Sequence, residues 1–385
     1  MEILRQKQPT PRKMARNNVK SNSAQSWEAT NFLSCVSFPG RVGGLRRTEY
    51  KVAGKFPVFD QGQEYISGYT DREDLVQTKV PAILFGDHTR VIKFIDHPYV
   101  LGADGTKMFW PREDINPSFL YQSLLRLKIP NTGYNRHFKW LKEAVINMPP
   151  ISEQKKIAEI LGAVDEEIAK TDEIIAATQK LKMGLMHDIF NFSNKKDVQV
   201  IALGDLGKVS MCKRIFKEET SAVGEIPFYK IGTFGKEPDA FISREIFDEY
   251  RKKFSFPRVG DVLLSASGTI GRKVKYDGRP AYFQDSNIIW LEHDESKVLN
   301  SFLFYLYDTI TWQTEGSTIK RLYNNILLRK KVPVPSIDKQ RGIVEVLSAI
   351  DEKISVNQKL KEKLTLLKKG LTQDLLSGEV RVLAN

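Results

Sequence analysis

The sequence contains little cysteine and no long apolar run. Its 385 residues include only two cysteines, Cys35 and Cys212, which cannot build a disulfide framework. No stretch of about 20 apolar residues occurs, so the sequence predicts no membrane span. The N-terminus is basic and polar, and it lacks the apolar segment of a secretory signal. These features together predict a cytoplasmic protein.

Signals for catalysis are also scarce. The five histidines show no metal-ligand spacing, and no phosphate-binding glycine loop or nucleophile elbow occurs. Asn116-Pro-Ser-Phe119 differs by one residue from the Asn-Pro-Pro-Phe/Tyr motif of amino-methyltransferases, but no glycine-rich cofactor loop precedes it. We therefore interpret Pro117 as the first residue of a helix. Asp239 and Glu245 suggest a nuclease carboxylate pair, but Phe247 stands where its lysine is expected. The sequence predicts no catalytic residue and no metal ligand.

The chain is basic, with 59 Lys and Arg against 47 Asp and Glu. Residues 1–26 carry six basic residues and one acidic residue, and their composition predicts a disordered basic tail. Segments 27–148 and 197–332 are mildly basic, with 16 against 13 and 21 against 18 charged residues. Segments 149–196 and 333–385 are nearly balanced. Charge alone leaves open whether the mildly basic segments bind an anion or are ordinary surfaces.

A long-range repeat dominates the sequence. Residues 149–190 return at 335–376 without a gap and at a constant offset of 186, so that Gln154 matches Gln340. Within both copies, apolar residues recur at steps of four and three, which is typical of a helix that packs on another helix along a narrow seam. A continuous helix of this length extends about 55 Å at about 1.5 Å per residue. The other copy, packed antiparallel, is the expected partner. The predicted helix-pairing residues are Ile157, Leu161, Val164, Ile168, Ile343, Leu347, Ile350 and Ile354.

Thr171 and Asn357 interrupt this seam at equivalent positions. A buried polar residue in a helix seam commonly fixes the register of the pair. Solvent exposure where the apolar pattern shifts explains the same residues equally well, so both interpretations stay open.

The segments between the helices alternate strand-like runs with Gly, Asp and Pro, and they correspond weakly to each other. The sequence therefore predicts a duplicated chain of the α/β class, in its α+β-like form. Two mixed α/β domains are separated by two long antiparallel coiled-coil helices and form pseudo-two-fold halves. The predicted parts are a disordered basic tail (1–26), a first domain (27–148), a first spacer helix (149–196), a second domain (197–332), a second spacer helix (333–378) and a C-terminal tail (379–385).

Two kinds of polar loop occur in both domains. One pair is Gly86–Arg90 and Ser265–Arg272, and the other is Gly133–Lys139 and Gly316–Leu322. Arg can fork onto guanine and Asn onto adenine, whereas Lys, Ser and Thr suit phosphates. A single loop of this kind is more often a solvated turn, but recurrence in both halves favours DNA contact. The predicted DNA-binding residues are His88, Thr89, Arg90, Tyr134, Asn135, Arg136, His137, Lys139, Ser267, Thr269, Arg272, Ser317, Thr318, Lys320 and Arg321.

With these motifs in place, the chain resembles the specificity (S) subunits of type I restriction–modification enzymes over roughly residues 27–378. In the first half the resemblance rests on Phe56-Pro-Val-Phe-Asp-Gln-Gly62 and Gly68-Tyr-Thr-Asp71. In the second half it rests on the segments Gly260–Gly271, Gly316–Leu322 and Val332–Pro335. The proline-led helix starts that lead to Gln154 and Gln340 complete it.

The resemblance implies a non-catalytic subunit with two target-recognition domains, each of which reads one half of a split sequence in double-stranded DNA. Its conserved helices would act as a ruler and dock two methyltransferase (M) subunits, which use S-adenosylmethionine to methylate adenine N6. Restriction (R) subunits, which use ATP and Mg, would join that core. This chain itself would hold no cofactor. Half-sites about one helical turn apart, ~10 bp, would let both domains enter the major groove from one side.

One alternative remains open at this point. A solitary or regulatory S-like protein would bind DNA without a working enzyme partner.

Overall fold

The computed structural model describes residues 27–40, 42–103, 105–191, 198–312 and 321–382. The predicted basic tail, residues 1–26, lies outside the described residues. The chain forms two compact units, one of residues 1–169 with 363–385 and one of residues 170–362. Among the described residues, no helix combines the length and the apolar character needed to cross a membrane.

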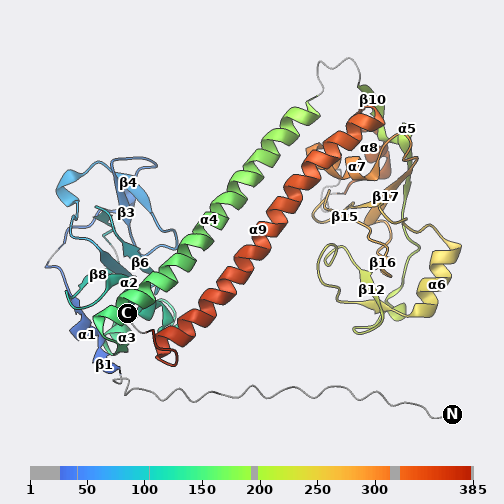
Figure 1. The fold of residues 1–385 in the computed structure, drawn as a ribbon. Coiled ribbons are helices and arrows are strands. Elements are labelled where there is room, and N and C mark those ends of the chain that lie inside the picture. The colour runs from blue at the N-terminus through green and yellow to red at the C-terminus, as the bar shows by residue number, and fades with distance from the viewer. Residues whose placement is uncertain (1–26, 41, 104, 192–197, 313–320, 383–385) are drawn as a thin grey trace, which may run out of the picture. The chain divides into compact units, whose positions relative to one another are not determined.

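The first domain contains three small sheets (Figure 1). The largest has the antiparallel order β2-β8-β5-β6. In the second, β3 pairs with β4 antiparallel and with β7 parallel, and in the third β1 pairs with β9. The strands are β1 (Glu28–Asn31), β2 (Val36–Ser37), β3 (Phe56–Phe59), β4 (Gly68–Thr70), β5 (Ala82–Gly86), β6 (Ile92–Ile95), β7 (Val100–Leu101), β8 (Thr106–Pro111) and β9 (Val145–Met148).

The second domain repeats this connectivity strand for strand. Its sheets have the orders β11-β17-β14-β15, β13-β12-β16 and β10-β18, and a parallel pair of strands again lies inside the three-stranded sheet. The duplication seen in the helices therefore extends to the whole half. The strands are β10 (Gln199–Ala202), β11 (Gly207–Ser210), β12 (Ile226–Tyr229), β13 (Phe241–Ile242), β14 (Val262–Ser265), β15 (Lys273–Lys275), β16 (Tyr282–Phe283), β17 (Ile288–His293) and β18 (Lys331–Val334).

Short helices pack on these sheets, and two long helices follow the two domains. The helices of the first unit's domain are α1 (Phe32–Cys35), η1 (Arg47–Glu49), η2 (Glu73–Leu75), α2 (Pro117–Arg126) and α3 (Phe138–Lys142). Those of the second are α5 (Leu203–Leu206), η3 (Lys217–Glu219), α6 (Arg244–Lys253), α7 (Asn300–Leu306), η4 (Tyr307–Thr309) and α8 (Asn324–Arg329). The long helices are α4 (Ile151–Phe190) and α9 (Ile337–Ser377).

The helix predicted to begin at Pro117 is confirmed. Pro117 occupies the first turn of α2, and the side chain of Asn116 accepts a hydrogen bond from the Phe119 backbone N–H. An N-cap of this kind satisfies a donor that the first helical turn leaves unpaired. The Asn-Pro-Ser-Phe sequence is therefore a helix start.

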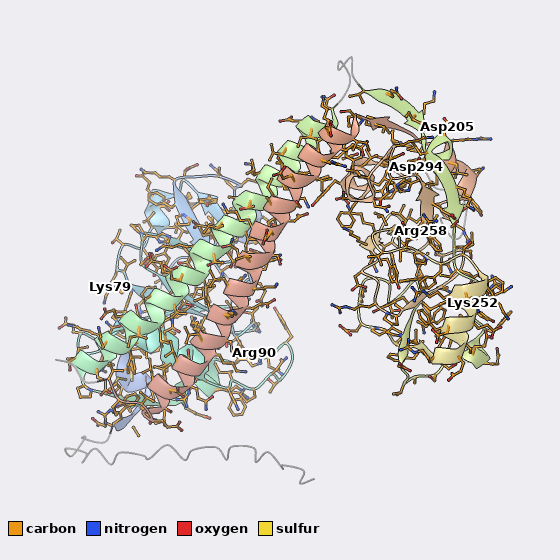
Figure 2. All side chains as sticks on the ribbon, turned by 45° about the vertical axis from the view of Figure 1, so that its right-hand side comes forward. Lys79, Arg90, Asp205, Lys252, Arg258 and Asp294 are labelled. Atoms are coloured by element: carbon orange, nitrogen blue, oxygen red, sulfur yellow. The ribbon has the colours of Figure 1, made fainter. Side chains whose placement is uncertain are left out.

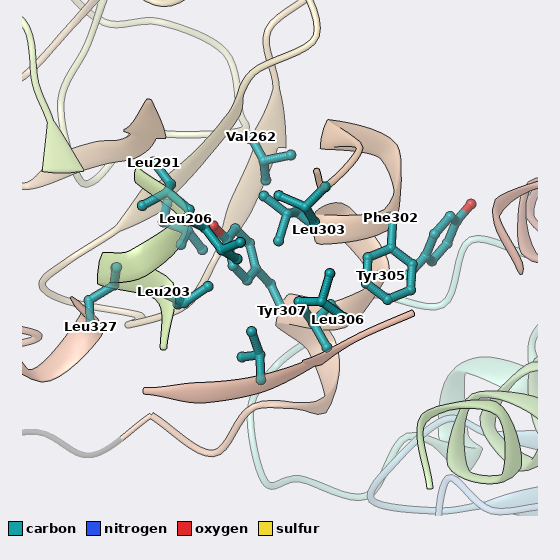
Figure 3. Close-up of a cluster of buried hydrophobic side chains, with 14 of the residues drawn as sticks. Leu203, Leu206, Val262, Leu291, Phe302, Leu303, Tyr305, Leu306, Tyr307 and Leu327 are labelled. Atoms are coloured by element: carbon teal, nitrogen blue, oxygen red, sulfur yellow. The ribbon is translucent and has the colours of Figure 1, made fainter. Parts of the chain in front are cut away.

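Each domain closes its core with the helix that follows the last strand of its four-stranded sheet, α2 after β8 and α7 after β17. In the second unit, Phe302, Leu303 and Leu306 of α7 pack with Val262 of β14 and Leu291 of β17 (Figure 3). In the first domain, Leu120 and Leu124 of α2 pack in the same way beneath β5 and β8. Burial of apolar side chains on one face of each sheet drives this arrangement.

A buried glutamine fastens the start of each long helix to the domain before it. The Gln154 amide donates to the Pro149 carbonyl at 2.9 Å, and its oxygen accepts from the Asn116 N–H at 2.8 Å. Gln340 forms the equivalent bonds with Pro335 and Leu299, both at 2.8 Å. This repeated contact accounts for the identity of the two residues at the helix starts.

Each long helix contributes residues to both units, because the unit boundaries fall within α4 and α9. In the second unit, Lys182 pairs with Asp351 at 2.5 Å and Lys361 pairs with Asp172 at 2.6 Å. Because the higher-numbered residue of α4 pairs with the lower-numbered residue of α9, the helices are antiparallel there. In the first unit, Lys368 of α9 pairs with Asp165 of α4 at 2.5 Å.

The predicted helix-pairing residues fall into two groups. Those nearest each helix start are buried against both the preceding domain and the end of the other long helix. Ile157 and Leu161 share a cluster with Phe119, Leu375 and Leu376. Ile343 and Leu347 share the core that contains Phe302, with Met186, Ile189 and Phe190 packed against it. The four residues further along, which are Val164, Ile168, Ile350 and Ile354, are only half-buried.

The two polar residues in the seam differ from each other. Thr171 is 3% exposed, whereas the half-buried Asn357 donates from its side chain to the Lys353 carbonyl one turn earlier, at 2.8 Å. The second helix is thus an imperfect copy of the first at this position.

Candidate nucleic-acid interface

In the first domain, the structure brings the two predicted polar loops together. Asp87, which follows β5 and is 3% exposed, accepts a hydrogen bond from the His137 N–H at 2.8 Å through its backbone carbonyl. Its carboxylate accepts from the Phe138 N–H, also at 2.8 Å. A buried carboxylate that binds backbone donors holds a loop in one geometry. Asp87 therefore clamps the loop before α3 onto the loop after β5.

His137 itself belongs to this clamp. The sequence suggested it as a DNA-contacting residue, but the structure buries it completely. Its Nδ1 lies 3.0 Å from the Asp87 carbonyl oxygen, and its Nε2 lies 3.3 Å from the Thr132 backbone nitrogen. The ring joins the base of the loop because its two nitrogens satisfy buried backbone groups, which leaves it no surface for a nucleic acid.

The tip of the same loop is exposed. The Tyr134 ring is 85% exposed and lies parallel to the His88 ring, with centroids 4.5 Å apart and an interplanar angle of 11°. Asn135, Arg136 and Lys139 are exposed as well, and the Lys139 ammonium lies 5.0 Å from the centroid of the Trp140 ring. This surface offers cations, an amide and a stacked aromatic pair, which are groups that contact phosphates and base edges.

A third segment, which the sequence did not single out as part of the site, forms hydrogen bonds with the loop after β5. Gln61, two residues after β3, accepts from the His88 N–H through its side chain at 3.1 Å. The Thr89 hydroxyl donates to the Gln61 carbonyl at 2.6 Å, and the Arg90 guanidinium donates to the Ile129 carbonyl at 3.2 Å. Thr89 and Arg90 thus each form a side-chain hydrogen bond within the domain. Figure 2 labels Arg90, which adopts a positive φ of 63°.

A polar cavity of about 390 Å³ lies among these segments. Its lining includes Arg47 of η1, Tyr50, Asp60, Gln61, His88, Thr89 and Tyr134. Burial opposes ionisation of Asp60, but hydrogen bonds from Ser67 and from the Gly62 N–H outweigh it and lower the pKa of this carboxyl. The Lys93 ammonium, 4.0 Å away, acts in the same direction. Asp60 is therefore ionised and organises the turn after β3.

The second domain brings its own pair of loops together by a different set of contacts. The Leu322 N–H donates to the Ala266 carbonyl at 2.8 Å, and Ser267 and Arg321 form an isolated β-bridge. The Ser267 hydroxyl donates to the Asn287 side chain at 2.7 Å. The Arg321 guanidinium donates to the Ser286 carbonyl at 2.7 Å. Predicted residues Ser317, Thr318 and Lys320 lie outside the described residues.

Arg272 ends the first of these loops and links it to the turn after β12. Its guanidinium donates to the Phe234 carbonyl at 3.0 Å and to the Thr269 hydroxyl at 3.2 Å. Gln284 joins the same turn by accepting from the Ile231 N–H at 2.9 Å. The turns after β12 and β16 are therefore part of the site in the second domain, as the turn after β3 is in the first.

A signal for these additional turns was present in the sequence. In each domain the three-stranded sheet contains a parallel pair, so its two strands end at the same edge, next to the loop from the four-stranded sheet. A glutamine follows the strands at Gln61 and at Gln284. Recognition of the parallel pairing would have grouped these glutamines with the polar loops.

An aspartate at equivalent positions connects each domain to the helix pair. The Asp165 carboxylate accepts from Gln122 of α2 at 2.8 Å and pairs with Lys368. The Asp351 carboxylate accepts from the Tyr305 hydroxyl of α7 at 2.9 Å and pairs with Lys182. Burial and this bond both raise the pKa of Tyr305, so its hydroxyl remains a proton donor at neutral pH.

These observations define a class of protein: two diverged copies of one α/β domain, each with polar loops gathered at one edge and anchored to long helices. The model of the type I restriction modification DNA specificity domain matches residues 44–179 and 195–366. The chain belongs to this family, the specificity subunits of type I restriction–modification systems. In such systems this subunit confers DNA specificity, and catalysis lies in the partner subunits.

Individual relatives agree with this assignment. A putative type I restriction enzyme specificity subunit of Haemophilus influenzae is 37% identical over 323 residues, which cover 79% of this chain and 82% of that protein. The MjaVIII specificity subunit of Methanocaldococcus jannaschii is 27% identical over 295 residues, 68% of each chain.

The fold is that of solved specificity subunits. The crystal structure of a type I S subunit from M. genitalium matches with a TM-score of 0.65 at 20% identity and covers 93% of this chain and 97% of that one. A chain from a study of complex assembly and conformational transition of a type I system matches with a TM-score of 0.52 at 15% identity, covering 92% and 98%. The predicted fold class is confirmed.

Proposed function

We propose that each domain of this chain reads one half of a split target in double-stranded DNA through the loop cluster described above. What supports the proposal is one observation: the same strand ends carry a polar loop cluster in both domains, but with different side chains. The first cluster presents Tyr134, Asn135 and Arg136, whereas the second is built around Ser267, Arg272 and Arg321. Readers of two different half-sites need this combination of a common scaffold and unlike contact residues.

The helix pair serves assembly in this proposal. Two modification subunits dock on the duplicated helices and transfer methyl from S-adenosylmethionine to adenine, and restriction subunits that use ATP and Mg join them. The repeat supports this because two copies of one partner require two similar surfaces. The near-neutral charge of the helical segments, against the mildly basic domains, suits protein contact more than DNA contact.

Co-expression with a modification subunit tests the proposal. We expect a complex with about two modification subunits per chain, and adenine methylation at one split motif in the host DNA. The chain alone, supplied with S-adenosylmethionine, should methylate nothing. Methylation by the isolated chain, or a methylated motif without a gap, would contradict the proposal. DNA binding without any complex would instead support a solitary regulatory protein.

A further inference from the structure

The outer edge of β9 is open for strand pairing. Among the described residues β9 pairs only with β1, in a two-stranded sheet. The Phe32 N–H donates to the Ala144 carbonyl at 2.9 Å, which fixes the alternation of the antiparallel ladder. By that alternation, the N–H and C=O groups of Val145 and Asn147 point away from β1. They form an exposed row of donors and acceptors.

This edge borders a large basic cavity within the first unit. The cavity has a volume of about 950 Å³ and lies between β9, the end of α2 and the last turns of α9. Val145, which is 55% exposed, contributes apolar surface. The charged lining consists of Arg126, Lys128, Lys368, Lys369 and one acid, Glu379. An extended acidic segment would therefore meet complementary charge as well as a free strand edge.

The second unit has the equivalent strand, but its edge is blocked. The Leu203 N–H donates to the Lys330 carbonyl at 3.0 Å, so the outward residues of β18 are Lys331 and Pro333. Proline has no N–H and is a common device for blunting a strand edge. Pro333 stands where the first unit has Asn147, at the same offset of 186. The cavity beside it is also smaller, about 450 Å³.

We propose that the β9 edge binds an extended acidic segment of a partner subunit as a third strand, and that the β18 edge does not. Added strands gain affinity from main-chain hydrogen bonds and specificity from alternate side-chain pockets. The inference deepens the proposed docking of two modification subunits. It makes the two docking sites unequal, because only one of them includes an added strand.

The test is Asn147→Pro, which makes the first edge like the second. The Asn147 N–H points away from β1, and β18 shows that this two-stranded sheet accepts proline at the position, so the full chain should fold normally. We expect Asn147→Pro to weaken the complex with modification subunits about tenfold or more. The matched variant Pro333→Ala should bind as the unchanged chain does, because removal of proline at the second edge disturbs no partner contact.

Hydrogen exchange identifies the contact directly. In the complex, the amides of Val145 and Asn147 should exchange about tenfold more slowly than in the free chain, whereas Lys331 should not change. Unchanged exchange at Val145 and Asn147, together with unimpaired assembly of the Asn147→Pro chain, overturns the inference and leaves the proposed function intact.

A peptide probe decides the question even without a complex. We expect a synthetic peptide of alternating glutamate and valine to bind the full chain and to protect Val145 and Asn147. It should bind Asn147→Pro at least about tenfold more weakly. A lysine–valine counterpart should bind more weakly than the acidic peptide. Equal binding of both peptides, no binding of the acidic peptide, or displacement of that peptide by DNA would each contradict an acidic strand as the occupant.

Discussion

At the scale of single residues, the polar loops contain two kinds of side chain: buried ones that hold the loops together and exposed ones at the surface. His137 and Asp87 are buried and hold the two loops of the first domain together. Arg136 is exposed, two residues after the stacked Tyr134. The loops could be predicted from the sequence, but this division could not, because burial depends on which strand ends meet in space.

Arg136→Ala should weaken DNA binding and leave the fold intact, because its side chain is exposed at the loop tip. A lost base contact costs about 1–3 kcal/mol and relaxes the preference at one position, whereas a lost phosphate contact weakens binding to all sequences alike. Titration of target and scrambled duplexes at several salt concentrations distinguishes the two.

Lys79→Ala is the control, since Lys79 lies over the Trp110 ring and is well separated from Arg90 in the view of Figure 2. Its binding should equal that of the unchanged chain. Equal losses in both variants would mean that general charge, rather than the loop, carries the affinity.

Glu153 is a second residue with a sharp expected phenotype. Its carboxylate binds the Arg381 guanidinium at 2.8 Å, the Val382 N–H at 3.1 Å and the Trp27 indole N–H at 3.2 Å. Burial opposes ionisation, but the bonds from Arg381 and Val382 outweigh it, and the pKa of Glu153 is lowered. A lowered pKa means that the contribution to stability is present above the pKa of the unfolded chain and is lost as the pH falls through the folded value.

Glu153→Gln should therefore lower the free energy of unfolding by about 1–3 kcal/mol at pH 7. The difference from the unchanged chain should shrink as the solution is acidified below the pKa of the unfolded carboxyl. Urea titrations at a series of pH values provide the measurement. A difference that stays constant into acid would show that the charge of Glu153 is unimportant.

At the scale of elements, the long helices have two roles along their length. The sequence predicted a narrow seam against the other helix with eight pairing residues, but of these only Ile157, Leu161, Ile343 and Leu347 are deeply buried, and they join domain cores as well as the other helix. Heptad spacing predicts that a helix has an apolar face, but it does not predict which element packs against that face. About the first three turns of each helix, up to Leu161 and Leu347, are therefore part of a domain, which periodicity alone could not reveal.

The aspartates that connect each domain to the helix pair, Asp165 and Asp351, provide a test at this scale. Asp351 receives both Tyr305 of α7 and Lys182 of α4, so Asp351→Asn removes an ion pair and weakens a hydrogen bond. The site is partly exposed, so we expect a loss of only about 1–2 kcal/mol, seen as a lower urea midpoint. Glu352→Gln, at the exposed neighbouring position, should leave the midpoint unchanged. Equal midpoints for Asp351→Asn and the unchanged chain would contradict a fastening role.

At the scale of the whole molecule, the repeat predicted the architecture well. The matching of strand orders between the two domains follows from it, even though the domain sequences have diverged. The contacts that complete each unit were beyond prediction, because they join segments far apart in sequence, such as Arg126 to the Leu376 carbonyl and Arg381 to Glu153.

Exchange of residues 27–148 for the corresponding domain of another family member should change one half of the methylated motif and leave the other half intact. The reason is that each loop cluster is built within one domain. Methylation mapping of DNA from cells that express the chimera and modification subunits measures this. A change in both halves together would contradict independent reading.

The contacts of Glu153 with Trp27, Arg381 and Val382 have a further consequence for the order in which the two repeats follow each other along the chain. In the second unit, β10 directly follows α4 along the chain. In the first unit, the equivalent strand β1 and helix α9 lie near opposite ends of the sequence. They are brought together because Trp27, Arg381 and Val382 all bind the Glu153 carboxylate. The connection from α4 to β10 and the contact between α9 and β1 are therefore equivalent, and the two repeats can be reordered by circular permutation. A permuted gene that links residue 382 to residue 27 and opens between 191 and 198 should encode the same molecule, with its two halves read out in reverse order.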